Sequence, residues 1–433
     1  MFTWLVHFNL LCAFLFTAFY LYRIRYFITT YKFWEKDITV RPAEKLSRLA
    51  VLISARNEEN VIGQLLTSIY AQDYPNTLYE VFVIADNCTD NTAMVARSKG
   101  AHVLERFNTT QVGKGYALNF AYQKIQTMYP KHYFDAYMVF DADNLLEPNF
   151  FTAMNRTFTA GNPIVTSFRN SKNYGTNWIS SGYALWFMYE GIFLNYPRTL
   201  LNRSCTISGT GFLVADSVLA ENGGWPFHLL TEDVEFSVNS VLQGYKISFC
   251  RDAVLYDEQP DTFKTSWRQR MRWCKGFYQV FANYGGRLSD ALVFNGSNYK
   301  NSRTIYYDIF FTLAPAAIIS LLSLFGTLGL WGLSFIPELL PPLEAVKVQA
   351  AAPFMLMNSF IGYYLILFVM GVLTLLKCRT MIYARRWEKI ISAFTFPLFM
   401  YTYLPIALVA LFKKVEWKPI RHSVAKSIDE VRT

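Results

Sequence analysis

An uncharged apolar run opens the chain. Residues 2–21 contain no Asp, Glu, Lys or Arg, and at about 1.5 Å per residue a helix of this length spans a hydrocarbon core of about 30 Å. Basic residues follow the run, at Arg23, Arg25 and Lys32, which favours a membrane-spanning helix over a cleaved signal peptide. By the positive-inside rule we expect the N-terminus outside the cell and residue 23 onward in the cytosol.

Short apolar stretches alternate with amphipathic ones between residues 49 and 140. The amphipathic stretch ENVIGQLLTSIYAQ repeats its apolar residues at helical spacing, whereas LAVLIS and YEVFVIA are typical of buried strands. The pattern predicts strands at 49–54, 79–85, 101–105 and 136–140, and helices at 59–72, 91–98 and 115–128. Such alternation is typical of a parallel sheet covered by helices, in which ligands bind at the carboxyl ends of the strands.

Three more apolar stretches follow residue 285, at 309–337, 353–376 and 390–412. The segment 377–389 has five basic residues and one acidic residue, whereas the segment 338–352 has one basic and two acidic residues. The first is therefore predicted to be cytosolic and the second external. The expected domains are a transmembrane helix (1–22), a cytosolic domain with interfacial helices (23–285) and a C-terminal membrane domain with a basic tail (286–433).

The last apolar stretch leaves two alternatives open. Residues 413–433 contain six basic and three acidic residues, which favours the cytosol, but a third full crossing would place them outside. Pro397 and Pro405 interrupt the stretch, so it is either a complete crossing or a broken, re-entrant segment followed by a cytosolic tail.

Composition narrows the functional class. Hydrophobic residues make up 52% of the 433 residues and charged residues 17%, against about 25% charged in average soluble domains, so a disordered chain is excluded. Basic loops at a membrane account for the net charge of +9, and no basic stripe interleaved with aromatic residues favours nucleic acid. The six cysteines form no CxxC pair, which favours a reducing compartment without a disulfide framework or a zinc site.

Polar residues at predicted strand ends are the first candidates for chemistry. Asp141 and Asp143 follow a buried strand and could hold Mg²⁺ or Mn²⁺ against a diphosphate, although on spacing alone a polar turn is the favoured interpretation. Asp86 has the same position after its own strand. Lys114, between two glycines, suits either a phosphate contact or a plain turn.

Two further motifs also have ordinary structural interpretations. Thr231-Glu232-Asp233 begins a predicted helix, where it could supply a general base or simply cap the helix, and spacing alone favours the cap. The segment 263–281, which contains Gln269-Arg270-Met271-Arg272-Trp273, interleaves aromatic and basic residues in the manner of an interfacial amphipathic helix.

The combination is far more specific than its parts. SARNEEN, Asp86, GKGYAL, DAD, SGTGF, TED and QRMRW occur in the order and approximate spacing of the family 2 inverting glycosyltransferases. The chain resembles their membrane-integrated branch, which includes cellulose, chitin, hyaluronan and poly-N-acetylglucosamine synthases. The resemblance covers residues 49–281 and implies an α/β GT-A (Rossmann-like) cytosolic catalytic domain flanked by transmembrane and interfacial helices.

The resemblance also implies a role for each matching residue. Asp233 matches the catalytic base and Glu232 its neighbour, and Asp141 and Asp143 match the metal-binding DxD, with Mg²⁺ or Mn²⁺ as cofactor. The implied nucleotide-sugar contacts are Glu58, Asp86, Lys114, Asp141, Asp143 and Arg272. The implied acceptor contacts are Gln269, Trp273, Ser208, Gly209, Thr210 and Gly211, although this loop lacks the cysteine of the cellulose synthase form.

The function implied is that of a processive polysaccharide synthase in the plasma membrane. It would transfer glucose or N-acetylglucosamine from a UDP-sugar to a growing β-linked glycan with inversion, coupled to export through the lipid bilayer. A homo-oligomer or an accessory export subunit is a further expected partner. The alternatives are a single transfer to a lipid acceptor, which product length would separate, and a silent scaffold or transporter. Intact acids at 141, 143 and 233 count against a silent protein, and the few charges in the apolar stretches count against a coupled transporter.

Overall fold

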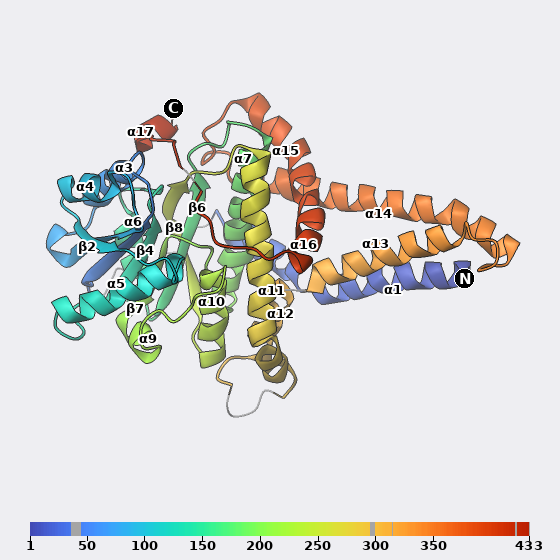
Figure 1. The fold of residues 1–433 in the computed structure, drawn as a ribbon, viewed down its shortest axis with the longest axis horizontal. Coiled ribbons are helices and arrows are strands. Elements are labelled where there is room, and N and C mark those ends of the chain that lie inside the picture. Colours follow the sequence, from blue (N-terminus) through green and yellow to red (C-terminus); the bar gives the residue numbers. More distant parts are fainter. Residues whose placement is uncertain (36–44, 295–298, 314, 421, 433) are drawn as a thin grey trace.

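The computed structural model describes residues 1–35, 45–294, 299–313, 315–420 and 422–432. An α/β unit carries a bundle of long helices that projects from it (Figure 1). The bundle consists of α1 (Phe2–Tyr20), α13 (Pro315–Leu333) and α14 (Pro342–Lys377). The N-terminus lies at the far end of the bundle beside the connection between α13 and α14, where the Met1 amino group donates to Glu344 at 3.0 Å.

The α/β unit is built on one mixed sheet of eight strands. Its order is β3-β2-β1-β4-β7-β6-β8-β5. The strands are β1 (Leu49–Ala55), β2 (Tyr79–Asp86), β3 (His102–Arg106), β4 (Ala136–Asp141), β5 (Leu145–Leu146), β6 (Ile164–Ser171), β7 (Phe212–Ala215) and β8 (Ile247–Asp257). Strands β1 to β4 are parallel and confirm the predicted alternation. The later strands, for which the pattern gave no prediction, include antiparallel pairs of β7 with β4 and β6 and of β5 with β8.

Alternating side chains of the strands divide the core into two layers. Leu49, Val51 and Ile53 of β1 face one layer, and Ala50 and Leu52 face the other. The first layer is covered by α3 (Ile62–Tyr70), α4 (Thr92–Ser98) and α6 (Phe150–Thr159). The second is covered by α5 (Lys114–Met128), α7 (Trp178–Tyr189), the π-helix η2 (Glu190–Asn195) and α8 (Tyr196–Leu200). The carboxyl ends of β1, β2 and β4 therefore lie at the edge between two covered faces.

Seven further helices in the described part of the chain lie around the sheet and at the base of the bundle. They are α2 (Arg23–Phe33), the short η1 (Asn76–Leu78), α9 (Asp216–Glu221), α10 (Glu232–Gln243), α11 (Phe263–Val293), α12 (Arg303–Leu313) and α17 (Ile428–Arg432). The predicted domain boundary after residue 285 falls inside α11. At the base of the bundle, Arg198 pairs with Asp308, and Tyr22 and Tyr26 donate to the same carboxylate. This network, in which Tyr26, Arg198 and Asp308 are buried, joins α2, α8 and α12.

The last apolar stretch is broken into α15 (Arg386–Tyr401) and α16 (Tyr403–Phe412). Pro397 lies inside α15, whereas Pro405 lies in the first turn of α16 and has no N–H to donate to the carbonyl of Tyr401. The buried Arg270 of α11 holds the break, because its Nη1 donates to the carbonyl of Phe399 at 3.1 Å and to Oγ1 of Thr402 at 2.6 Å.

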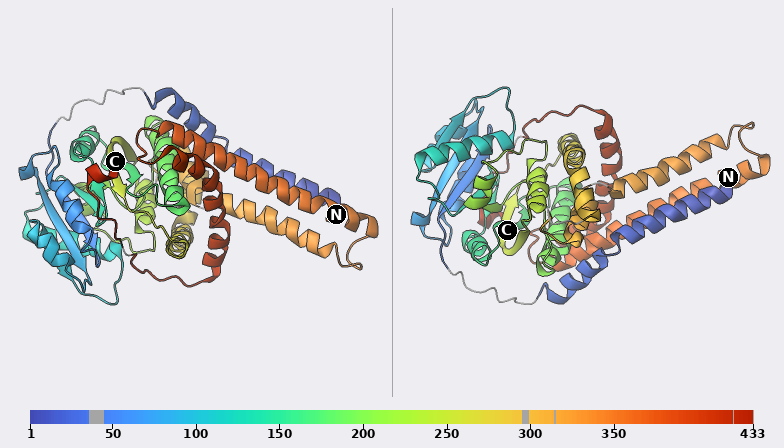
Figure 2. Two further views of the ribbon diagram at one scale, coloured as in Figure 1. Left: turned by 90° about the horizontal axis from the view of Figure 1, so that it is seen from above. Right: turned by 90° about the horizontal axis from the view of Figure 1, so that it is seen from below.

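The broken segment packs on α14 of the bundle as well as on the α/β unit. By length and apolar composition α1, α14 and the combined segment Arg386–Phe412 could each cross a membrane. However, α15 packs on α7, and α16 packs on α11 (Figure 2). The chain then returns to the sheet, where α17 lies at the C-terminal end (Figure 1). The structure therefore shows that the segment is broken and that the tail that follows it packs against the α/β unit.

Candidate active site

One cleft of about 170 Å³ lies at the carboxyl ends of β1, β2 and β4. Eleven of the fourteen predicted site residues line it, although they come from both halves of the α/β unit. They are Glu58, Asp86, Lys114, Asp141, Asp143, Gly209, Glu232, Asp233, Gln269, Arg272 and Trp273. The predicted site residues therefore converge on one place.

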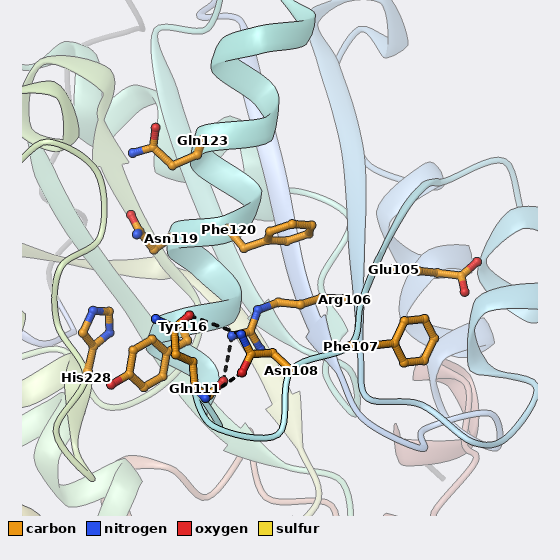
Figure 3. A pocket seen from close by; sticks show the side chains of 10 residues that line it. All are labelled: Glu105, Arg106, Phe107, Asn108, Gln111, Tyr116, Asn119, Phe120, Gln123 and His228. Carbon is orange, nitrogen blue, oxygen red and sulfur yellow. Dashed lines mark hydrogen bonds between the residues drawn. The ribbon is translucent and has the colours of Figure 1, made fainter.

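A larger side cavity of about 430 Å³ adjoins this cleft but contains none of the predicted site residues. Its wall includes Tyr116 and His228, whose rings stack with centroids 3.9 Å apart (Figure 3). Arg106 also lines this cavity, and its Nη1 donates to Oδ1 of Asp86 at 2.6 Å. The buried Arg106–Asp86 ion pair thus forms the boundary between the side cavity and the cleft.

The DAD motif turns two carboxylates toward the cleft. Asp143 is 4% exposed, and its Oδ2 accepts a hydrogen bond from the backbone N–H of Glu258 at 2.7 Å. Asp141 lies at the end of β4 and pairs with Lys114, whose Nζ also donates to the carbonyl of Gly209 at 2.8 Å. Lys114 therefore links the carboxylate of Asp141 to the loop of residues 208–211, called the SGTG loop below.

The chemistry of these side chains fits a divalent cation shared with a substrate. Mg²⁺ is usually held by one or two carboxylates together with substrate phosphates rather than by an all-protein cage. Asp141 and Asp143 supply two carboxylates, and the neighbouring Glu58 has a buried Oε2 without a hydrogen-bond partner. Within the described residues no cluster of three or more acidic, His or Cys side chains forms a complete cage. Asp141 and Asp143 are therefore the residues that would hold the cation.

The TED motif begins α10 but does not cap it. The side chain of Thr231 makes no capping hydrogen bond, and its Oγ1 is buried without a partner. Burial, and next the neighbouring Asp233, raise the pKa of Glu232 to about 7. Burial likewise raises the pKa of Asp233 above its ordinary value. Two carboxyls with raised pKa values at the mouth of a cleft suit acid-base chemistry, which counts against the interpretation as a helix cap.

The QxxRW residues share one face of α11. Gln269, Arg272 and Trp273 are three and four residues apart, so all three reach the cleft. One side of the Trp273 ring packs edge-on against Tyr183 and Phe187, with centroids 5.7 and 6.1 Å away. Trp273 thus joins the cleft to an aromatic cluster between α7 and α11.

The SGTG loop divides into lining and supporting residues. Gly209 lines the cleft at a φ of +80°, which favours glycine. Thr210 and Gly211, predicted as acceptor contacts, do not line it. Oγ1 of Thr210 accepts from the backbone N–H of Asp141 at 2.9 Å, and Gly211 donates to the carbonyl of Val139 at 2.9 Å. These two residues hold the loop against β4, and Ser208 lies behind the lining as well.

The C-terminal tail forms one wall of the cleft, which the sequence did not predict. Trp417, Lys418, Pro419, Ile420 and His422 line it. Nδ1 of His422 lies 2.9 Å from Oε1 of Glu58. Burial disfavours the charged imidazolium, but the carboxylates of Asp143 and Glu58 outweigh burial and raise the pKa of His422 to about 10. The tail therefore brings a positive charge to the acidic side of the cleft.

Polar and apolar contacts fasten the tail outside the cleft. The carboxylate of Glu258 accepts from the backbone N–H groups of Ser423 and Val424 at 3.0 and 2.8 Å. Nζ of Lys172 donates to the carbonyl of Val424 at 3.1 Å. In α17, Val431 is buried against Leu145 and Tyr256. All of these contacts follow the lining residues in sequence, so they anchor the wall at its C-terminal end.

Two buried side chains of the cleft also lacked a sequence signal. Arg169 of β6 pairs with Asp257 of β8, and its Nη1 donates to the carbonyl of Ser208 at 3.0 Å. Burial outweighs the positive charge of Arg169 and raises the pKa of Asp257 to about 6. Neither residue belongs to a sequence motif. The two are far apart in the chain and come together only because β6 pairs with β8.

If the cleft binds the UDP-sugar donor that the family resemblance implies, Val431→Asp should weaken that binding although residue 431 lies outside the cleft. A charge in the buried contact with Leu145 and Tyr256 undocks α17 and loosens the wall that carries His422. Losing one or two polar contacts to the donor corresponds to about a 5- to 50-fold rise in the dissociation constant for UDP. Calorimetry on purified protein measures this constant, and the exposed Asp429→Asn is the matched control. Unchanged UDP affinity in Val431→Asp would show that the wall makes no donor contact.

Comparisons with known proteins agree with this geometry. Residues 47–276 match the family model described as glycosyltransferase like family 2. The probable glycosyltransferase YdaM of Bacillus subtilis is 27% identical over 56% of this chain and 58% of that protein. A poly-beta-1,6-N-acetyl-D-glucosamine synthase of Staphylococcus epidermidis is 25% identical over 59% of this chain. A beta-monoglucosyldiacylglycerol synthase of Synechocystis is 25% identical over 55% of it. The matched region spans 49 to 61% of the length of these relatives.

The fold comparison extends over nearly the whole chain. The mannosyltransferase PcManGT from Pyrobaculum calidifontis, solved with GDP-Man and Mn²⁺, aligns with 94% of this chain and 99% of its own at a TM-score of 0.56 and 17% identity. This similarity confirms the GT-A fold of the α/β unit. With the family model matching more than half of the chain, the protein belongs to glycosyltransferase family 2.

Proposed function

We propose that the protein transfers glucose or N-acetylglucosamine from a UDP-sugar to an acceptor hydroxyl, with inversion at the anomeric carbon. The observation that carries the proposal is that Asp233, the DAD carboxylates and Arg272 line one cleft. Asp233 accepts the proton of the acceptor hydroxyl as its oxygen attacks the anomeric carbon, and Arg272 stabilises the negative charge on the departing UDP. Mg²⁺ or Mn²⁺ held by Asp141 and Asp143 supplies further positive charge to the diphosphate.

The donor occupies the β-strand side of the cleft in this proposal. Glu58 and Asp86 contact the uridine, and Lys114 lies next to the nucleotide. The tail closes this side through Trp417 and His422. The names of two relatives support a UDP-hexose or UDP-N-acetylhexosamine donor, because one makes a glucosyl lipid and the other an N-acetylglucosamine polymer.

For the acceptor, the leading proposal is a growing β-linked glycan that is exported through the membrane. The aromatic ring of Trp273 at the cleft suits a pyranose, whose C–H face packs on a ring. The poly-N-acetylglucosamine synthase among the relatives supports a polymer.

The helix bundle favours a lipid acceptor as a second candidate. Its helices pack on one another around Leu5, Leu330, Val348 and Ala352. The polar side chain of Asn9 is already bonded to Ser323 and Thr327 within the bundle. A single copy of the described bundle is thus filled by its own side chains, so polymer export would need a second copy or an accessory subunit. A lipid acceptor needs no such conduit, and one relative makes a glucosyl lipid.

Product length decides between the two acceptors. Membranes that contain the protein are incubated with individual radiolabelled UDP-sugars, and the products are divided into a lipid extract and a polymer fraction. Linkage-specific hydrolases then identify the bond. Radiolabel in polymer of many sugars supports the processive synthase, radiolabel in a single-sugar lipid supports the second candidate, and radiolabel in neither fraction would contradict transfer itself.

We expect Trp273→Ala to weaken acceptor binding while donor binding changes little. Loss of aromatic burial costs roughly 1–3 kcal/mol, which corresponds to about a 5- to 150-fold loss of acceptor affinity. Hydrolysis of the UDP-sugar by water should continue while transfer declines. If Trp273 serves only to pack against Tyr183 and Phe187, both rates will decline together per amount of folded protein.

We further propose that the α/β unit lies in the cytosol of an integral plasma membrane protein. In that orientation a cysteine at Val346, which is 62% exposed near the far end of the bundle, is labelled by an impermeant thiol reagent added to intact cells. A cysteine at Thr380, on the side of the α/β unit, is labelled only after permeabilisation. Wild-type protein supplies the background from its six native cysteines. Labelling of both positions in intact cells would refute this orientation.

A further inference from the structure

A carboxylate outside all the recognised motifs, which does not itself line the cleft, reaches the SGTG loop. Glu190 is the first residue of the π-helix η2, which interrupts the helical path between α7 and α8. π-Helical turns are rare and occur frequently at functional sites. Gly191 allows this turn to lie close to β6, since a methyl group at Gly191 would be only 3.1 Å from the ring of Phe168. The π turn therefore directs the side chain of Glu190 toward the SGTG loop. This loop precedes β7, which lies next to β6 in the sheet.

The contact between Glu190 and the loop is a direct hydrogen bond. Oγ of Ser208 donates to Oε2 of Glu190 at 2.9 Å. The carbonyl of the same serine accepts from Arg169, and the carbonyl of Gly209 accepts from Lys114. Three side chains from three elements thus fix two successive residues of the loop.

The fixed loop lies against the proposed base. A methyl group placed on Gly209 would be 3.9 Å from Oδ2 of Asp233, so this glycine lies directly beside the carboxylate of the proposed base. Burial raises the pKa of Glu190, and the negative charge of Asp233 raises it further. The hydrogen bond from Ser208 and the positive charges of Arg198 and Arg169 act in the opposite direction. Ser208 and Gly209 thus connect Glu190 to the neighbourhood of Asp233.

We propose that Glu190 is a positioning residue for the acceptor: through Ser208 it holds Gly209 at the distance from Asp233 that an acceptor hydroxyl requires. The inference rests on the proposed function, because it concerns the residue that holds the acceptor side of the same cleft in place. The proposed uridine contacts, Glu58 and Asp86, make no hydrogen bond to this loop, which Lys114 holds independently of Glu190. Loss of the Glu190–Ser208 bond therefore affects transfer to the acceptor and spares donor binding and hydrolysis.

The first experiment measures the hydrogen-exchange protection of the SGTG loop and does not depend on catalytic activity. Amide hydrogen exchange of a peptide that covers residues 206–212 is compared in wild-type protein, Glu190→Ala, Glu190→Gln and Ser208→Ala. Exchange should be faster in Glu190→Ala and Ser208→Ala and close to wild type in Glu190→Gln, since glutamine retains an oxygen that accepts from Ser208. Ser240→Ala is the matched control, because Ser240 is buried in α10 and its hydroxyl has no partner among the described residues. Unchanged exchange in Glu190→Ala would overturn the proposal.

The second experiment tests the acceptor role by kinetics. The loss of a hydrogen bond to a charged group predicts about a 10- to 100-fold lower kcat/KM for transfer in Glu190→Ala. Hydrolysis of the UDP-sugar should stay within about twofold of wild type, Glu190→Gln should recover most of the transfer, and the double variant with Ser208→Ala should be no worse than either single variant.

Two outcomes separate this inference from the proposed function. A proportional loss of transfer and hydrolysis in Glu190→Ala, with faster exchange throughout the protein, would show a merely structural role and overturn the inference. Absence of transfer by the wild-type protein with every UDP-sugar would instead overturn the proposed function, and the exchange of residues 206–212 would still decide whether Glu190 positions the loop.

Discussion

Asp233→Asn is expected to lower the rate of glycosyl transfer by about 10²- to 10⁴-fold, the range that a general base contributes. Asparagine has nearly the same shape as aspartate but cannot accept the proton of the acceptor hydroxyl at neutral pH. Asp233 belongs to the cleft but is not among the proposed donor contacts, so the affinity for UDP should change little. The measurements are initial transfer rates and UDP binding by calorimetry.

The control and the pH profile make this prediction specific. Asp252→Asn changes a partly exposed aspartate outside the cleft, which pairs with Arg156, and should leave transfer unchanged. Because Asp233 must be deprotonated to act, kcat/KM should fall about tenfold per pH unit below its pKa. Burial raises that pKa, so the acid limb should lie above the value of about 3.9 for an exposed aspartate. Near-normal transfer by Asp233→Asn would exclude Asp233 as the base.

Asp143→Asn is expected to remove most of the metal-dependent activity. Its amide oxygen can still accept from the N–H of Glu258, so the local fold is preserved, but the negative charge that holds the cation is lost. Loss of several kcal/mol of charge stabilisation at the diphosphate corresponds to a rate at least about 100-fold lower. Transfer is measured across a range of Mn²⁺ and Mg²⁺ concentrations.

Chelation supplies the complementary test of the cation. Wild-type protein treated exhaustively with a chelator should lose transfer and regain it when Mn²⁺ or Mg²⁺ is added. Asp135→Asn, at an aspartate outside the cleft that pairs with Lys45, should respond to metal as wild type does. Full activity after chelation would contradict the assignment of Asp141 and Asp143.

Local patterns predicted the parts of the fold that depend on neighbouring residues. Strands β1, β2 and β4 were predictable because each buries a short apolar run next to an amphipathic helix, and β3 continues the same alternation at the exposed edge of the sheet. DAD and TED were placed correctly because a strand end and a helix start are both visible in the sequence. The three motif residues of α11 converge because helical spacing alone puts them on one face.

Long-range contacts account for what the sequence did not predict. The break at Thr402 depends on Arg270, more than a hundred residues earlier, as much as on Pro405. Arg169 meets Asp257 only through strand pairing, and Glu190 reaches Ser208 only because a π turn directs it there. The tail has no motif, and His422 meets Glu58 across 364 positions of sequence.

Because the C-terminal tail forms one wall of the cleft, this wall is added last during synthesis. During synthesis, Glu58, Asp141 and Asp233 leave the ribosome before α13 and α14, whereas Trp417 and His422 follow them. A nascent chain therefore holds its acidic residues without the wall that covers them until both helices have been made. A chain truncated anywhere before residue 417 therefore keeps the acidic residues of the cleft but lacks this wall.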